Sequence, residues 1–191
     1  MSKKSSKAYA ARLEIDYPEK LNRLTTVFRP ILVIPITIVM KLLSTSLALA
    51  TLLMIVFRMK YPKWWFEFSR ELARFSTRVC AYSALLTDAY PSTTKDQAVH
   101  LEIDYPDVEK DLNRWMPLVK WLLAFPHYVI LAFLWLCAIV AIVIAWFAII
   151  ITGRYPKGLF NFVVGVIRWN LRVNAYMYLL VTDKYPPFGM A

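Results

Sequence analysis

The chain repeats itself, so whatever fold one half adopts, the other half is expected to adopt as well. Leu-Glu-Ile-Asp-Tyr-Pro stands at Leu13–Pro18 and again at Leu101–Pro106. The further matches keep their order and spacing: Asn22-Arg23 with Asn113-Arg114, Pro35 with Pro126, Tyr61-Pro62-Lys63 with Tyr155-Pro156-Lys157, Arg74 and Arg78 with Arg168 and Arg172, Leu85-Leu86 with Leu179-Leu180, and Thr87-Asp88 with Thr182-Asp183. We divide the chain into a basic N-terminal tail (1–11), repeat one (12–91), a linker (92–99) and repeat two (100–188).

Each repeat contains a long hydrophobic block. Phe28–Phe57 carries only Arg29 and Lys41 as charges, and Trp115–Ile151 carries only Lys120. About 20 apolar residues cross a bilayer core as a helix, and a chain of 191 residues is too small to cover two such helices in water. Hydrophobic residues make up 59% of the chain, against about 45–50% in soluble domains. The sequence therefore predicts a mainly α membrane protein.

A proline inside each block is expected to start or kink a helix, because it removes a backbone donor and clashes with the preceding turn. We predict a short leading helix before each proline and a long membrane helix after it. The short helices are expected at Thr25–Ile34 and Trp115–Phe125, and the long ones at Pro35–Phe57 and Pro126–Ile151.

Each repeat opens with an alternating segment. Leu13, Ile15 and Tyr17 alternate with charged residues, and the copy from Leu101 does the same. This period of two predicts a short half-buried strand that ends at a proline. The two strands could pair with each other or with a partner chain, or each segment could lie extended on the membrane surface.

Each repeat closes with an amphipathic helix whose apolar stripe steps by three and four residues. The stripes are Trp65, Phe68, Leu72, Phe75, Val79, Tyr82 and Leu86, and Leu159, Phe162, Val166, Trp169, Val173, Tyr176 and Leu180. Such a helix lies in the membrane interface, packs against other helices, or crosses the bilayer in a larger bundle. The fold expected is a tandem duplication in which each repeat has a short strand, a Pro-kinked hydrophobic membrane helix and an amphipathic helix.

Two groups of residues are candidates for binding. The first is Arg70, Arg74, Arg78, Arg168 and Arg172, whose guanidinium groups suit lipid phosphates or carboxylates of a partner. The alternative is a solvated or headgroup-facing stripe. The second group is Asp16, Tyr17, Asp104 and Tyr105, which either dock a partner or simply terminate the strands.

Orientation depends on how often each repeat crosses the membrane. One crossing per repeat would invert the repeats and place many basic residues on the outer side, against the positive-inside rule. Hairpins would give both repeats one orientation and let the two Leu-Glu-Ile-Asp-Tyr-Pro segments meet. We expect a shared orientation.

The sequence offers no recognisable catalytic, cofactor or metal site. It has no Gly-rich phosphate loop, no His-Glu-x-x-His and no Gly-x-Ser-x-Gly. Each of the two histidines lacks a nearby second ligand, and His127 is expected to be an interfacial polar anchor. The net charge of +10 lies along membrane helices, without a nucleic-acid motif, so an anionic membrane surface is the expected partner and nucleic acid is not.

The segments of repeat two resemble a known family. They are Leu101–Pro106, Asn113–Trp115, Val119–His127, Thr152–Pro156, Arg168-Trp169 and Thr182–Phe188. They look like the bacterial membrane family catalogued as domain of unknown function 4389, in two tandem copies. Repeat one departs from it, with Phe57-Arg58-Met59-Lys60 in place of Thr-Gly-Arg and Pro35-Ile36 in place of Pro-His. The resemblance implies a bacterial membrane protein without an established activity and transfers no catalytic residue.

We expect a non-catalytic accessory or scaffold subunit of a larger complex in the bacterial inner membrane, multi-pass or hairpin-inserted. Its expected partners are anionic lipids and either other membrane proteins or further copies of itself. The alternative is a lipid-handling or bilayer-shaping protein that acts through interfacial amphipathic helices. A membrane enzyme is the third possibility, and the residues favour it least because no acid–base or metal cluster can be assembled.

Overall fold

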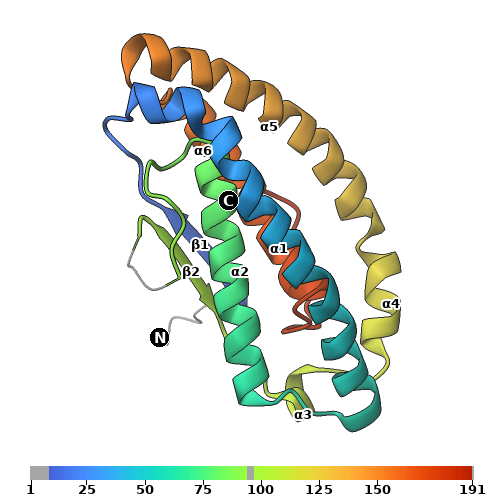
Figure 1. Ribbon diagram of the computed structural model, residues 1–191. Helices are drawn as coiled ribbons and strands as arrows, with labels where there is room; N and C mark the ends of the chain where they lie inside the picture. The colour runs from blue at the N-terminus through green and yellow to red at the C-terminus, as the bar shows by residue number, and fades with distance from the viewer. Residues whose placement is uncertain (1–8, 94–96, 191) are drawn as a thin grey trace, which may run out of the picture.

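The computed structural model describes residues 9–93 and 97–190, without the side chains of 41–48, 109 and 111. Lys41 therefore lies outside the described side chains. The chain is mainly helical, with two short strands (Figure 1). The elements are β1 (Ala11–Ile15), α1 (Arg23–Arg58), α2 (Lys63–Ser83), β2 (Val99–Ile103), α3 (Val108–Asp111), α4 (Met116–Leu123), α5 (Phe125–Thr152) and α6 (Lys157–Met177).

The two strands pair with each other, antiparallel, which resolves the choice left open by the sequence. Leu13 stands opposite Leu101, its own counterpart in the other repeat. A strand pair in which equivalent residues face each other is symmetric, so a local two-fold axis passes between these two leucines. Both strands have the alternating burial that the sequence predicts, with Leu13 and Ile15 turned inward.

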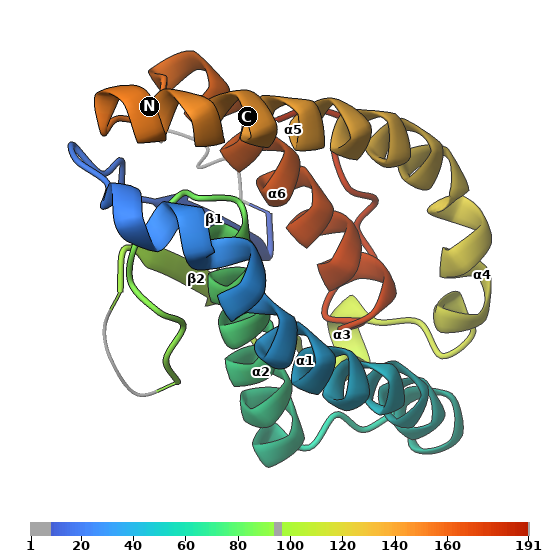
Figure 2. The same ribbon diagram turned by 45° about the horizontal axis from the view of Figure 1, so that its top comes forward.

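The strands are exchanged between the repeats. β1 of repeat one packs on α6 of repeat two, and β2 of repeat two packs on α2 of repeat one. The amphipathic helices in turn contact the hydrophobic ones, α2 against α1 and α6 against α5. The result is three layers: the sheet, then α2 and α6, then α1, α4 and α5. Equivalent helices run in opposite directions in both views (Figures 1 and 2).

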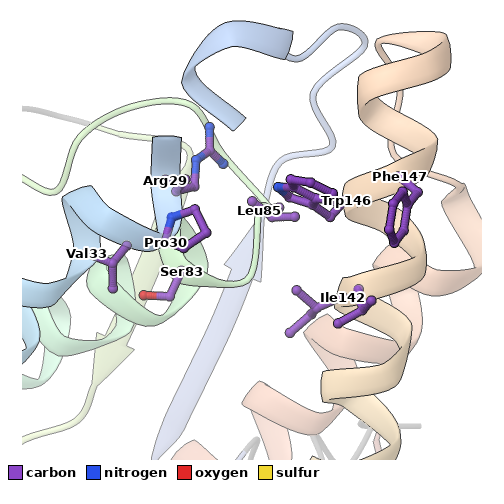
Figure 3. A pocket seen from close by; sticks show the side chains of 9 residues that line it. Arg29, Pro30, Val33, Ser83, Leu85, Ile142, Trp146 and Phe147 are labelled. Carbon is purple, nitrogen blue, oxygen red and sulfur yellow. The ribbon is translucent and has the colours of Figure 1, made fainter. Parts of the chain in front are cut away.

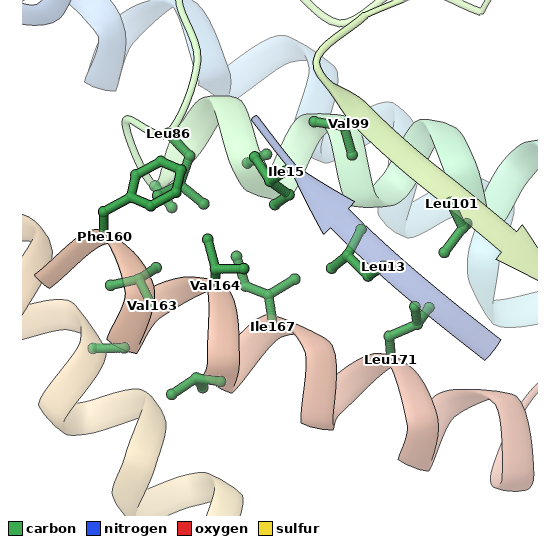
Figure 4. Packing of buried hydrophobic residues seen from close by; sticks show 14 of the residues in the cluster. Leu13, Ile15, Leu86, Val99, Leu101, Phe160, Val163, Val164, Ile167 and Leu171 are labelled. Carbon is green, nitrogen blue, oxygen red and sulfur yellow. The ribbon is translucent and has the colours of Figure 1, made fainter. Parts of the chain in front are cut away.

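The main core lies between the sheet and the amphipathic helices (Figure 4). Leu13, Ile15 and Leu101 point from the strands toward α6, where Phe160 and Ile167 meet them. This explains the period-two pattern of the strands and the apolar stripe of α6 together. Each apolar face is covered by the other, at roughly 25 cal/mol for each Å² of apolar surface removed from water.

The sequence predicts that a proline divides each hydrophobic block into a short and a long helix. The structure shows this division in repeat two only. Repeat two divides at Ala124, between α4 and α5. The division expected at Pro35 is wrong, because α1 continues as one helix through Pro30 and Pro35. Pro30 has no N–H for the carbonyl of Thr26. The indole Nε1–H of Trp146 on α5 donates to that carbonyl at 3.1 Å instead.

The hydrophobic helices of both repeats end at a residue with left-handed backbone. It is Met59 (φ 49°) after α1 and Gly153 (φ 73°) after α5. Glycine adopts this conformation without steric cost, whereas methionine has a Cβ that crowds the carbonyl. The same position is therefore relaxed in repeat two and strained in repeat one.

We expect Met59→Gly to stabilise the protein and Gly153→Ala to destabilise it by about 1 kcal/mol. The gain at Met59 is smaller than the loss at Gly153, because glycine also makes the unfolded chain more flexible and the partly buried methionine side chain is lost. Thermal unfolding of the detergent-solubilised protein measures both. If the two variants shifted the unfolding temperature by the same amount in the same direction, backbone strain at Met59 would not explain the result.

The amphipathic helices are also followed by a left-handed leucine, Leu85 (φ 63°) after α2 and Leu180 (φ 54°) after α6. The structure therefore aligns Leu85 with Leu180, one residue later than the sequence match of Leu85 with Leu179. The extra residue of repeat two falls at the end of α6. With Leu85 aligned to Leu180, the Thr87-Asp88 pair also aligns with the Thr182-Asp183 pair.

Candidate functional site

Two of the candidate arginines hold the exchanged strands. Arg168 on α6 donates its Nε–H to the carbonyl of Leu13 on β1 at 3.0 Å. Arg74 on α2 donates to the carbonyl of Leu101 on β2 at 3.5 Å. These two bonds are equivalent under the two-fold axis. They join the middle of each amphipathic helix to the middle of the strand from the other repeat.

The other candidate arginines also have contacts within the chain. Arg70 and Arg74 both pair with Glu71, and Arg78 donates to the carbonyl of Ser92 at 2.5 Å. Arg172 is buried in α6. The structure does not bring the five arginines together into one patch. Their binding to lipid headgroups or to a partner stays a prediction.

The strand-end tyrosines dock on the opposite repeat. The hydroxyl of Tyr17 donates to the carbonyl of Tyr155, and the hydroxyl of Tyr105 donates to the carbonyl of Tyr61 at 2.6 Å. Asp16 and Asp104 pair across the sheet with His100 and Arg12, respectively. These residues therefore make contacts between the two repeats, and docking of a separate partner on them stays a prediction.

An aromatic cluster surrounds each of these tyrosines. Tyr17 packs edge-on against Phe160 with ring centroids 4.9 Å apart, and Tyr105 packs on Phe66 at 5.0 Å. Tyr61 donates to the carbonyl of Leu179 at 3.0 Å. Burial raises the pKa of Tyr61 to about 12, because the phenolate would lose its hydration. Tyr61 therefore remains a hydrogen-bond donor throughout the physiological pH range.

We expect Arg168→Gln to cost about 1.5–3 kcal/mol of folding free energy, because it removes a charge-assisted bond to a buried strand. Arg74→Gln should cost less, because its bond to Leu101 is 0.5 Å longer. Arg70→Gln, which removes a half-exposed pair with the neighbouring Glu71 and a distant contact with the ring of Phe66, is the control and should change stability by under about 0.5 kcal/mol. Thermal unfolding ranks the three. Equal losses for Arg168 and Arg70 would show that the strand bond is not stabilising.

The most deeply buried charges are not among the candidate residues predicted from the sequence. Arg29 on α1 is 1% exposed and Lys120 on α4 is 0% exposed. Arg29 pairs with Asp88 and donates to the carbonyl of Thr87 at 3.0 Å. Lys120 pairs with Asp183 at 2.7 Å and donates to the carbonyl of Thr182 at 2.8 Å. The two sites are equivalent, one in each repeat.

The surroundings of both cations match as well. Arg29 lies 4.6 Å from the ring centroid of Tyr82, and Lys120 lies 4.8 Å from that of Tyr176. The aspartate in each site also accepts the backbone N–H of the asparagine that opens the repeat's helical part, at 2.7 Å in repeat one and 2.6 Å in repeat two. Each buried cation therefore joins the start of its repeat to the end.

A signal for these sites is present in the sequence. Arg29 and Lys120 lie within otherwise largely apolar blocks, and each stands seven residues after the asparagine of the repeated Asn-Arg pair, whereas Lys41 has no such counterpart. The Thr-Asp pair is the acidic motif repeated at the other end. A buried cation needs a carboxylate, so pairing the two motifs was possible in principle.

His127 is buried in α5, so its ring is not exposed as the interfacial anchor that the sequence predicts. Its Nδ1 accepts the indole N–H of Trp169 at 3.1 Å, and its ring stacks on Phe188 at 4.1 Å. The C-terminal segment covers it, which the spacing of the sequence could not show. His100 lies on the exposed face of the sheet. Among the described residues no group of three or more His, Cys, Asp or Glu is placed to hold a metal ion.

A cavity of about 380 Å³ lies between α1, the end of α2 and α5 (Figure 3). Its wall is mostly apolar and includes Val33, Ile142 and Trp146. The polar side chains among its lining residues include Arg29 and Ser83. The Nε of Arg29 is buried and has no hydrogen-bond partner.

The third layer exposes its apolar side chains. α1 and α5 contain stretches long and apolar enough to cross a membrane, and only 17% and 22% of the residues in these stretches are buried. Phe133, at the centre of one such face on α5, is 66% exposed. Soluble monomers rarely expose apolar patches larger than a few hundred Å². The other exposed apolar residues of α5 are Val129, Leu136, Ile139, Val140, Val143, Ile144, Phe147 and Ile151.

These features define a class: a mainly helical protein built from two tandem copies, with two helices able by length and composition to cross a membrane. The chain belongs to the family described as Domain of unknown function (DUF4389), whose model matches residues 23–95 and 114–189. The two matches confirm the family resemblance and the duplication. No curated protein and no solved structure matches the chain.

Proposed function

We propose that the protein is a non-catalytic accessory or scaffold subunit of a bacterial inner-membrane complex, bound to lipid through its third layer and to other proteins through its sheet. The observation that supports this best is the opposition of two unlike faces. The third layer exposes apolar helices, and the sheet exposes the polar residue His100 and the charged residues Arg12, Glu14 and Glu102. A protein with one apolar and one charged face can hold a second protein at a membrane.

Affinity purification in mild detergent tests this function. A tagged chain should bring down a membrane protein in a fixed stoichiometric ratio. The double variant Glu14→Lys and Glu102→Lys reverses two charges on the sheet. It should no longer bring down the partner protein, although the chain itself stays in the membrane fraction. Glu19→Lys, an exposed change outside the sheet, is the control. A chain that purifies alone in every case would exclude the scaffold.

Lipid handling is the second candidate, and the cavity between α1 and α5 favours it. Its volume lies within the usual range of about 300–1,000 Å³ for ligand sites. The apolar wall suits an acyl chain.

Filling the cavity tests lipid handling. Ile142→Trp should reduce binding of a spin-labelled phospholipid at least tenfold, because the larger ring occupies the cavity. Val140→Trp on the exposed face of the same helix is the matched control and should leave binding unchanged. Equal binding by the two variants would exclude the cavity as a lipid site.

A further inference from the structure

The sheet is centred over the middle of the amphipathic helices. Arg74 and Arg168 lie near the midpoints of α2 and α6 and bond to Leu101 and Leu13, the central residues of the two strands. α1 and α5 pack on the other side of the same two helices. Any orientation of the helices relative to a membrane therefore also fixes the depth of the sheet.

Helices that crossed the bilayer would carry this sheet to its mid-depth. The charged outer face would then meet hydrocarbon, at a cost of roughly 2.5–3.5 kcal/mol or more for a charge such as that of Arg12 or Glu102. Each strand of the two-stranded sheet would also present one open edge to lipid, which has no groups to satisfy its backbone. Crossing helices are therefore incompatible with the position of the sheet.

The length of α1 leads to the same result. Its 36 residues extend about 54 Å, whereas the hydrocarbon core is about 30 Å thick. Arg23 and Arg58, the charged ends of α1, are both exposed. A crossing α1 could keep these two residues at the interfaces only by tilting steeply or bending.

Exposed basic residues also flank both ends of the apolar helices. Arg23, Arg154 and Lys157 lie near one end, where Leu21 donates its N–H to the carbonyl of Gly153 at 3.0 Å. At the other end, where Met59 packs with Leu112, the basic residues are Arg58, Lys60, Lys63 and Arg114. Crossing helices would divide these charges between the two sides of the membrane, against the positive-inside bias.

We propose that the chain lies flat in one leaflet of an anionic bilayer, with α1, α4 and α5 embedded parallel to the surface and the sheet in water. This inference rests on the proposed function only for the statement that the third layer binds lipid. The two-fold axis then runs along the membrane normal, so both repeats have the same orientation. Both basic clusters meet the headgroups of a single leaflet, where each Lys or Arg contributes about 1 kcal/mol.

Double-cysteine labelling tests this orientation in proteoliposomes of phosphatidylcholine and phosphatidylglycerol. Lys20→Cys and Lys60→Cys place one thiol near each end of α1, in a chain whose Cys80 and Cys137 are replaced by alanine. A membrane-impermeant maleimide is added to intact vesicles, and mass spectrometry counts the labels on each molecule. Molecules that lie in one leaflet carry two labels or none, whichever way they were inserted. A majority with a single label would overturn the proposal.

Two control pairs fix the interpretation. Lys60→Cys with Arg114→Cys, and Lys20→Cys with Arg154→Cys, place both thiols at the same end and should be labelled together in either topology. Phe133→Cys should be protected from the maleimide until detergent is added. Labelling of Phe133→Cys in intact vesicles, or release of the chain by alkaline carbonate, would instead contradict the membrane binding on which the proposed function depends.

Discussion

Asp88→Ala is expected to destabilise the protein by about 3–5 kcal/mol, because it leaves Arg29 buried without a counter-charge. Arginine stays protonated under these conditions, so Arg29 cannot relieve the cost by losing its proton. The variant also leaves the backbone N–H of Asn22 without its acceptor. For a chain of this size the loss corresponds to a fall in Tm on the order of 10 °C.

A double variant separates the ion pair from the fold around it. Arg29→Met with Asp88→Asn removes both charges and keeps an oxygen for Asn22, so it should recover most of the loss. Asp183→Ala, the equivalent change in repeat two, should cost less, because Lys120 can lose its proton once its partner is gone. Thermal unfolding in detergent measures all three. A double variant as unstable as Asp88→Ala alone would refute the account of an uncompensated charge.

Phe160→Ala is expected to cost about 3–5 kcal/mol, as large-to-small changes in cores do. Phe160 is 3% exposed and packs against Tyr17 from the other repeat and Tyr155 from its own. Its removal therefore leaves a void where the strand of repeat one docks on repeat two. Thermal or urea unfolding of the solubilised protein would measure the loss.

Phe66→Ala is the matched change in repeat one. Phe66 is also 3% exposed and packs against Tyr105 and Tyr61 in the same way. The two variants should lose similar stability, and each should unfold in a single transition, because each phenylalanine supports contacts between the repeats. Two separate transitions, with only one of them shifted, would contradict the interdependence of the repeats.

The sequence predicted those elements correctly whose residue pattern follows from the burial of one face. The alternation around Leu13 and Leu101 predicted strands, and the stripe of α6 predicted a helix, because burial of one face leaves a period in the sequence. The failures lie where the outcome depends on distant partners. Pro35 does not divide α1, and the carbonyl that Pro30 frees is occupied by Trp146, more than a hundred residues away.

The candidate sites show the same limit. The sequence shows that Arg74 is repeated at Arg168. Their acceptors, however, are backbone carbonyls of strands in the opposite repeat, and every residue type has such a carbonyl, so the sequence could not identify them. Asp16 was recognised as part of a motif, but its His100 partner depends on the register of the sheet. Arg29 was visible as one of two charges in its apolar block, and only the fold showed that Asp88 reaches it.

The exchange of strands has a consequence for how such a chain can originate. Neither repeat covers its own strand, whereas two copies of a single repeat, related by the axis between Leu13 and Leu101, would make all the equivalent contacts. That arrangement is a domain-swapped homodimer, with the isologous interface that two-fold symmetry requires. The present chain has the arrangement of such a dimer with its two halves joined end to end. Fusion lets the halves diverge, as Met59 and Gly153 or Arg29 and Lys120 have done, without losing one another as partners.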